Sequence, residues 1–233
     1  MRPALGLIGA CLAAMAMATA APAATLDLVV VDQQGKPVAD AVVTAVPAPA
    51  TAVAHAGATG KATANGQGAE PRAARTKTID QKDLTFLPYV QVFRPGDSVV
   101  FRNSDTTRHH VYSFSSVRAF EFVLAPGETS APQRLDQAGV VAVGCNIHDP
   151  MVAYLYVSSA PWAQLSDAQG RAKLRDLPAG RYEIHVWQPR LRPGRPDLVR
   201  RVVEVGDSGS KLTFQLSLLP DPRRQFDRER TQY

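Results

Sequence analysis

A short loop near residue 145 carries three side chains that bind soft metal ions. In the run Gly144–Met151, the residues Cys145, His148 and Met151 follow the spacing Cys-x2-His-x2-Met. This donor set suits copper, because sulfur favours Cu(I), imidazole binds either oxidation state and a thioether is a weak axial ligand. Zinc accepts thiolate and imidazole, but a thioether is a poor zinc ligand. The loop therefore predicts copper rather than zinc.

Two adjacent histidines, His109 and His110, offer the second imidazole that a trigonal His2Cys copper site requires. Neighbouring residues of a strand point to opposite faces, so only one of the two can face a metal. Asn103 and Asp105 precede them in a polar turn. We expect these two side chains to bond nearby backbone groups and to tie the His109 strand to the ligand loop.

The stretch Val99–Val157 resembles the cupredoxins, the blue copper proteins of the plastocyanin and amicyanin type. The resemblance is carried by Phe101–Asp105, by His109–Val111 and by the Cys-x2-His-x2-Met loop. More closely, Ile79–Gln81, His109–Ser115 and Gly144–Asp149 look like bacterial proteins labelled methylamine utilization proteins. The resemblance implies a Greek-key β-sandwich with one mononuclear type 1 copper, and it favours His109 over His110. The ligands carried over from the resemblance are His109, Cys145, His148 and Met151.

Other chemistries at this loop are less well supported by the residues. A Cys–His nucleophile pair needs an orienting group and an oxyanion hole, and nothing in the sequence marks either. A mononuclear metal with all positions filled leaves no place for substrate, so the chain is predicted not to be an enzyme. Pro150 stands where the resemblance expects tryptophan. It stiffens the loop by fixing φ and leaves the solvent access of the site open.

The first residues predict export. Met1-Arg2 is followed by an apolar run from Ala4 to Ala20 and by small residues to Ala24, a pattern typical of a cleaved secretory signal peptide. We expect a periplasmic protein with no transmembrane segment in the mature chain. Of the two cysteines, Cys11 then leaves with the signal. A thiol in an oxidising compartment is a liability unless something such as a metal occupies it, although a buried, inert Cys145 remains the alternative.

Beyond the signal, the chain reads as all-β. Short alternating or β-branched runs, separated by Gly, Pro, Asp and Asn, predict many short strands in sandwiches. His55 falls in an Ala- and Gly-rich stretch and His185 in a strand, and neither is expected to bind metal. The expected segments are a signal peptide (1–24), the first part of an outer sandwich (25–46), a flexible linker (47–75), the cupredoxin domain (76–160), the second part of the outer sandwich (161–219) and a frayed, charged tail (220–233).

The outer sandwich is expected because residues 26–46 and 163–218 each resemble part of one small domain. The turn and hairpin Asp32–Val43 is similar to the opening of carboxypeptidase-regulatory or transthyretin-like domains, and Leu177–Tyr182 to a later part. We therefore hypothesise that the cupredoxin unit is inserted between the two parts, since a loop tolerates an insert whose ends lie close together.

The formal net charge of +5 comes largely from arginines after residue 189. They are not interleaved with aromatic platforms, which argues against nucleic acid as a partner. The basic face is either simply solvated or docks an acidic redox partner protein. Three functions follow in order of preference: an electron carrier, a copper storage, delivery or sensing protein without electron transfer, and a metal-free adhesion or carbohydrate-binding sandwich.

Overall fold

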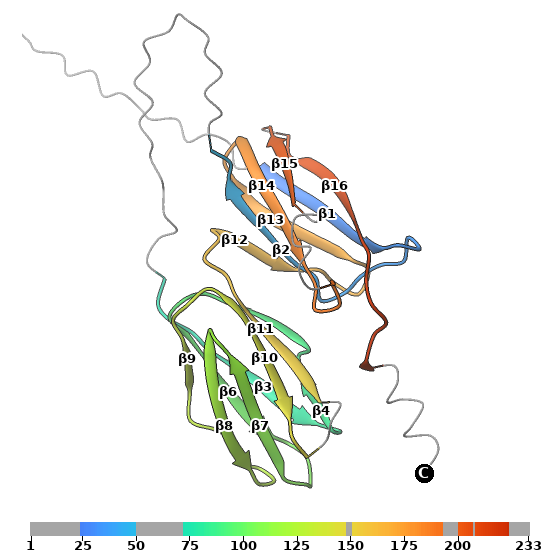
Figure 1. Cartoon of the computed structure of the whole chain (residues 1–233). Helices are drawn as coiled ribbons and strands as arrows, with labels where there is room; N and C mark the ends of the chain where they lie inside the picture. The colour runs from blue at the N-terminus through green and yellow to red at the C-terminus, as the bar shows by residue number, and fades with distance from the viewer. Residues whose placement is uncertain (1–23, 50–71, 148–150, 193–199, 207, 224–233) are drawn as a thin grey trace, which may run out of the picture.

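The computed structural model describes residues 24–49, 72–147, 151–192, 200–206 and 208–223 (Figure 1). Every named element within these residues is a β-strand, from β1 to β16, and the strands form four sheets. The sheets face one another in two sandwiches, which confirms the predicted all-β class with a second β unit. Residues 1–23 of the predicted signal peptide (1–24), His55, most of the predicted linker and His148 lie outside the described residues, while Ala24 begins β1.

The first sandwich comprises residues 76–157. Consecutive strands repeatedly fall in different sheets, as in Greek-key sandwiches. One sheet has the order β4-β3-β6-β9 and the other β5-β11-β10-β7-β8. The bounds are β3 (Thr76–Lys82), β4 (Thr85–Leu87), β5 (Val90–Phe93), β6 (Asp97–Asn103), β7 (His109–Ser115), β8 (Arg118–Leu124), β9 (Gln133–Leu135), β10 (Gly139–Cys145) and β11 (Val152–Val157).

Alternation of side chains builds the core of this sandwich. Along β6, Val99 and Phe101 point inward and are fully buried, while Arg102 is exposed. The ring of Phe101 packs edge-on against Phe86 of β4, with centroids 6.3 Å apart. Each such buried side chain contributes about 1.5–3 kcal/mol through the hydrophobic effect. The resulting core extends without a break to Cys145 and Met151 at one end of the sandwich.

An ionised side chain anchors the start of β6. Asp97 is buried, and its carboxylate accepts hydrogen bonds from the backbone N–H groups of Arg75 and Arg94 and from the Arg72 guanidinium, each at 2.9 Å. Burial opposes ionisation, but these donors outweigh it and hold the pKa of Asp97 below its ordinary value. The carboxylate therefore closes the loop before β6 as a charged acceptor.

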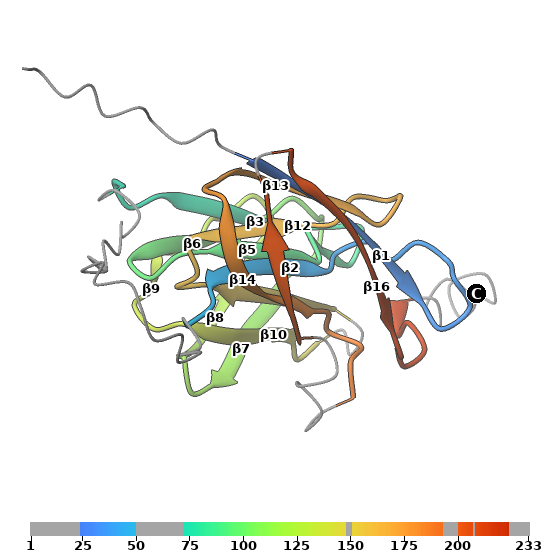
Figure 2. The ribbon, with the colours of Figure 1, turned by 90° about the horizontal axis from the view of Figure 1, so that it is seen from above.

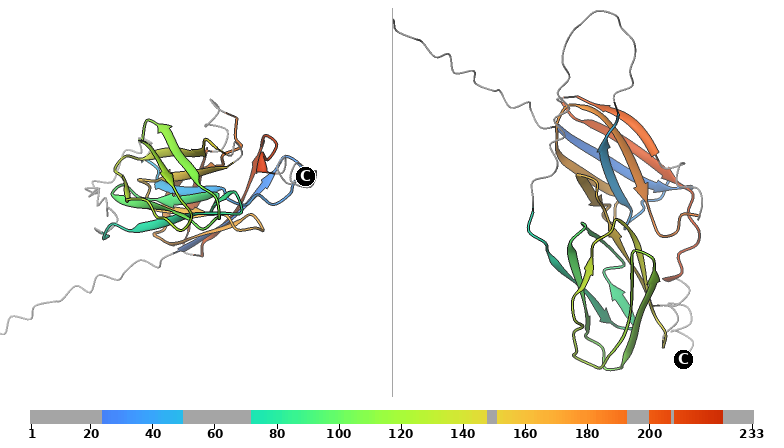
Figure 3. Two further views of the ribbon diagram at one scale, coloured as in Figure 1. Left: turned by 90° about the horizontal axis from the view of Figure 1, so that it is seen from below. Right: turned by 60° about the vertical axis from the view of Figure 1, so that its left-hand side comes forward.

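The second sandwich joins the first two described strands to strands of the C-terminal part of the chain (Figures 1 and 3). β1 pairs with β13 and, in parallel, with β16, and β2 pairs with β12 and β14. The segment 76–157 therefore lies, in the sequence, between the strands of this sandwich. Figure 2 shows β1 and β16 running side by side. The bounds are β1 (Ala24–Asp32), β2 (Val42–Pro47), β12 (Trp162–Leu165), β13 (Arg171–Leu177), β14 (Gly180–Trp187), β15 (Arg200–Val205) and β16 (Ser210–Leu216).

An aromatic cluster joins the two sandwiches. Trp187 of β14 contacts the rings of Tyr154 and Tyr156 on β11, with centroid distances of 5.9 and 5.1 Å. Near the C-terminus, the Arg223 guanidinium lies 3.8 Å from the centroid of the Tyr89 ring and pairs with Asp221 at 2.8 Å. Both charged residues belong to the tail predicted to fray. For them that prediction is wrong, because an ion pair and a cation–π contact hold them against the first sandwich.

Candidate metal centre

Strand pairing brings two of the four predicted ligands together. His109 begins β7 and Cys145 ends β10, and the antiparallel register places Cys145 opposite Val111, two residues from His109. Since side chains two residues apart share a face, both point into the sandwich. Their relative exposures are 0% and 3%. The Cys145 Sγ lies 3.7 Å from the His109 Nδ1.

Met151, the third predicted ligand, precedes β11 at the same end of the sandwich. Its side chain is buried in the same core cluster as Cys145. The Cys145 N–H donates to the carbonyl oxygen of Met151 at 3.2 Å. This bond closes the loop between the two sulfur-bearing residues. His148, the fourth predicted ligand, lies within this loop but outside the described residues.

His110 faces away from this centre. Its Nε2 is 2.8 Å from the Glu121 Oε1 on β8, and its side chain is 21% exposed. Its backbone carbonyl accepts a hydrogen bond from the Asn146 N–H at 3.1 Å. Of the two adjacent histidines, His109 is thus the one on the Cys145 side. The other histidine that the structure describes, His185, points elsewhere, with its Nε2 3.0 Å from the Glu183 Oε1 on β14.

Asp105 orients the His109 ring. Its Oδ2 lies 2.7 Å from the His109 Nε2, and its carboxylate also accepts the backbone N–H groups of Asp83 and Leu84. Burial opposes ionisation, but the His109 hydrogen bond and the two N–H donors hold the pKa of Asp105 below its ordinary value. An ionised carboxylate at Nε2 favours a proton on that nitrogen, which leaves the Nδ1 lone pair facing Cys145.

The sequence identified Asp105 as a turn former and missed its contact with the imidazole. Asn103 has the local role that was expected. Its Nδ2 donates to the carbonyls of Thr107 and Leu124, and its Oδ1 accepts the Asp105 N–H at 3.0 Å. The described bonds of Asp105 tie His109 to the turn after β3, whereas we had expected a tie to the ligand loop. The spacing Asp-x3-His is the one signal that could have suggested the contact.

The donors fit a small, soft metal ion. Two metal–ligand bonds of about 2.0 and 2.3 Å, roughly 120° apart, would hold a nitrogen and a sulfur about 3.7 Å apart, and the observed separation is 3.7 Å. The described residues contain no group of three or more His, Cys, Asp or Glu side chains able to hold a metal. His148 lies outside the described residues, and the thioether of Met151 is not one of these four side-chain types. One imidazole, one thiol and one thioether are therefore the described part of the candidate site.

A tyrosine covers the strand beside the thiol. Gly144 pairs with Tyr112 across β10 and β7, and a Cβ at Gly144 would lie 2.8 Å from the ring carbon and hydroxyl oxygen at the end of the Tyr112 side chain. The absence of a side chain at Gly144 thus lets the ring lie flat over the strand next to Cys145. This ring lies on the outer face of the sheet, opposite to the face that carries the Cys145 side chain.

Comparison with known proteins gives structural likeness only. No family model matches the chain, and no curated protein matches it. Among solved structures, it is similar to a Cu(I) amicyanin variant (16% identity, TM-score 0.33, 35% of this chain and 80% of that one). It is also similar to a reduced amicyanin variant (18%, 0.34, 39% and 89%) and to a copper-containing nitrite reductase from Thermus scotoductus (22%, 0.33, 35% and 22%). Likeness at these identities concerns the fold alone and establishes no function.

No helix among the described residues is long and apolar enough to cross a membrane.

Proposed function

We propose that this chain is an exported, periplasmic type 1 copper protein that carries single electrons. The observation that supports this most strongly is the buried pair of Cys145 Sγ and His109 Nδ1, 3.7 Å apart, with the Met151 side chain buried in the same cluster. Copper would be held by His109, Cys145 and Met151 together with His148. When bound, it would supply a one-electron Cu(II)/Cu(I) couple.

The protein's own contribution is a dry and fixed set of ligands. Asp105 holds the His109 ring through Nε2, and the Cys145 N–H to Met151 carbonyl bond fixes the ends of the loop. Both contacts are made by the protein's own groups, so they would restrain the donors in either oxidation state of the metal. A site that changes little between oxidation states transfers electrons with little reorganisation. This favours a carrier over a storage protein, which must release its metal.

The proposal includes a protein partner and excludes catalysis. Four donors around one metal would leave no position for a substrate, so we assign no enzymatic activity. The excess of arginine in the C-terminal part of the chain suits an acidic redox partner. The methylamine utilization type, the transthyretin-like nature of the outer sandwich and the signal peptide remain hypotheses from the sequence.

The first test is a visible absorption spectrum of the mature protein after addition of Cu(II). We expect an intense thiolate-to-copper band that is lost in Cys145→Ser. The matched pair His109→Ala and His110→Ala tests the histidine assignment, because these neighbours face opposite sides of β7. The band should be lost or strongly altered in the first variant and kept in the second.

Reversible one-electron voltammetry with rapid self-exchange would complete the case for a carrier. Copper uptake without the absorption band would replace electron transfer by storage, delivery or sensing. Failure to take up copper at all would overturn the proposal and direct attention to the outer sandwich as an adhesion or carbohydrate-binding module.

A further inference from the structure

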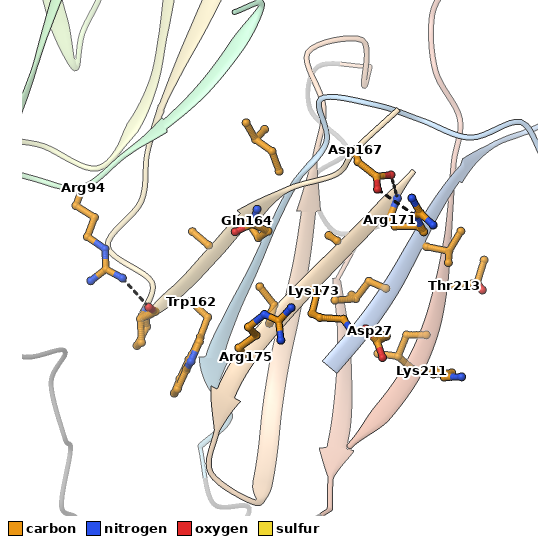
Figure 4. A pocket seen from close by; sticks show the side chains of 18 residues that line it. Asp27, Arg94, Trp162, Gln164, Asp167, Arg171, Lys173, Arg175, Lys211 and Thr213 are labelled. Atoms are coloured by element: carbon orange, nitrogen blue, oxygen red, sulfur yellow. Dashed lines mark hydrogen bonds and ion pairs between the residues drawn. The ribbon is translucent and has the colours of Figure 1, made fainter. Parts of the chain in front are cut away.

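The second sandwich contains a groove that the copper proposal does not use. It encloses about 1060 Å³ and is bounded by the sheet β13-β1-β16 and by β12 of the opposite sheet (Figure 4). Basic side chains project from β13 and β16, and Trp162 lies at the β12 wall. We call it the β13 groove and define it by Asp27, Trp162, Arg171, Lys173, Arg175 and Lys211.

Strand periodicity and register produce a regular pattern of positive charge. Along β13, Arg171, Lys173 and Arg175 are exposed while the intervening Ala172 and Leu174 are buried. These three cations therefore share one face and repeat every second residue. Across the sheet, Asp27 of β1 lies opposite Lys173 on one side and Lys211 on the other. One acid is thus flanked by bases on both neighbouring strands.

The acids of the groove are already neutralised. Asp27 pairs with Lys173 at 3.0 Å, and Asp167 pairs with Arg171, also at 3.0 Å. Within the described residues, Arg175 and Lys211 form no ion pair. The lining therefore keeps an excess of positive charge. A groove with charge of one sign attracts ligands of the opposite sign.

Two strand edges border the same groove. β13 is the outermost strand of its sheet, and β12 is the outermost strand of the other. Among the described residues, no strand pairs with the outer backbone groups of β13. Such an edge can accept a further strand. A second copy of β13 would place arginine and lysine against arginine and lysine, so charge repulsion disfavours self-pairing and favours an acidic strand.

We propose that the β13 groove binds an extended acidic peptide segment of a partner protein, added as a strand to the edge of β13. In an extended segment, alternate side chains on one face lie about 6.6–6.8 Å apart. Acidic residues at every second position would therefore meet Arg171, Lys173 and Arg175 one to one. Trp162 supplies a fixed apolar wall, since its ring packs edge-on against Tyr182 at a centroid distance of 5.5 Å. This inference does not depend on copper.

The test measures binding of a labelled peptide of alternating glutamate and threonine to the whole mature chain by fluorescence anisotropy. We expect binding that weakens with salt and is lost in the glutamine–threonine counterpart. Lys173→Gln combined with Arg175→Gln, two neighbouring cations on the same face of β13, should weaken it at least about tenfold, as expected for two charge-assisted contacts. The matched control is Lys36→Gln with Lys82→Gln, which removes the same charge at exposed positions outside the groove and should change the affinity little.

Three results would each overturn the proposal. Equal weakening by the control variant would mean diffuse charge attraction rather than a site. Undiminished binding of a peptide N-methylated at alternate amides would exclude addition as a strand. Tighter, groove-dependent binding of oligogalacturonate or of oligo-dT than of the peptide would assign the groove to an acidic saccharide or a nucleic acid. Circular dichroism of each variant checks that the sandwiches are intact.

Discussion

The two adjacent histidines provide an internal control for the role of Asp105. The His109 Nε2 contacts Asp105 at 2.7 Å, where the carboxylate side chain is 11% exposed. The His110 Nε2 contacts Glu121 at 2.8 Å, where the carboxylate is 58% exposed. Asp105→Asn and Glu121→Gln therefore make the same chemical change to the same kind of contact. Only the first contact belongs to the proposed metal ligand.

The expected magnitudes differ because of what each carboxylate bonds. Asp105 uses both oxygens, accepting Leu84 N–H and His109 on Oδ2 and Asp83 N–H on Oδ1. An amide nitrogen cannot accept, so Asp105→Asn loses at least one bond and destabilises the metal-free protein by about 1–3 kcal/mol. Loss of a carboxylate behind a ligating histidine weakens metal binding about 10–100-fold. Glu121 forms an exposed pair worth at most about 1 kcal/mol.

The assay is competition for Cu(I) with a chromogenic chelator near neutral pH, with urea unfolding of the metal-free variants measured separately. Nitrogen-15 NMR of the metal-free protein reports the His109 tautomer, with the proton expected on Nε2. Equal losses of copper affinity in the two variants would refute the positioning role of Asp105. A larger loss in Glu121→Gln would identify His110 as the ligand. A proton on Nδ1 of His109 would contradict the orientation inferred from the Asp105 contact.

Three further perturbations test the packing. Gly170→Ala should cost more than about 2 kcal/mol in urea unfolding, because φ is +71° and a Cβ would lie 2.3 Å from a backbone oxygen. Gly35 has a similar φ of +77° but no atom within 4 Å of the position that a Cβ would take, so Gly35→Ala should cost only about 1 kcal/mol. Equal costs for the two variants would show that the backbone at Gly170 shifts to relieve the contact with the backbone oxygen. The pKa of Asp97 is lowered in the folded protein. Its carboxylate therefore stabilises the fold fully above the unfolded pKa of about 3.9, and this contribution to stability is lost as the pH falls through the lower folded pKa. Asp97→Asn should therefore flatten the acid limb of stability against pH, and an unchanged slope would contradict this. Trp187→Ala should lower the free energy of unfolding by roughly 2–3 kcal/mol, which is less than a fully buried ring contributes. It should also separate the unfolding of the two sandwiches into two calorimetric transitions. A single unchanged transition would mean that the aromatic cluster does not couple them.

Strands with strong local signals were predicted closely, and weakly patterned ones were missed. β7 (His109–Ser115), β10 (Gly139–Cys145) and β11 (Val152–Val157) occupy β-branched or alternating runs of the kind from which strands were predicted. β13 was not predicted, because its outward positions are arginine and lysine, which have little strand propensity. What stabilises β13 is pairing with β1, more than a hundred residues earlier. Local propensity carries no information about such a partner.

The charged tail illustrates the same limit. Composition after residue 220 favours a solvated segment, and no local pattern distinguishes Arg223 from the arginines that follow it. Its position is decided by the Tyr89 ring and the Asp221 carboxylate. Asp221 is a sequence neighbour, but Tyr89 lies more than a hundred residues earlier in the chain. The sequence cannot show that they meet.

The sequence by itself determined the donor types and their spacing in the Cys145 loop, the all-β class and the fact that His109 and His110 must face opposite sides. These are local properties, set by side-chain chemistry and by the two-residue period of a strand. Only the tertiary structure decided which histidine faces Cys145, that Asp105 bonds its ring and that β1 and β2 pair with strands after residue 161. Each of these depends on strand register between distant segments, where a shift of one residue would turn every side chain to the other face.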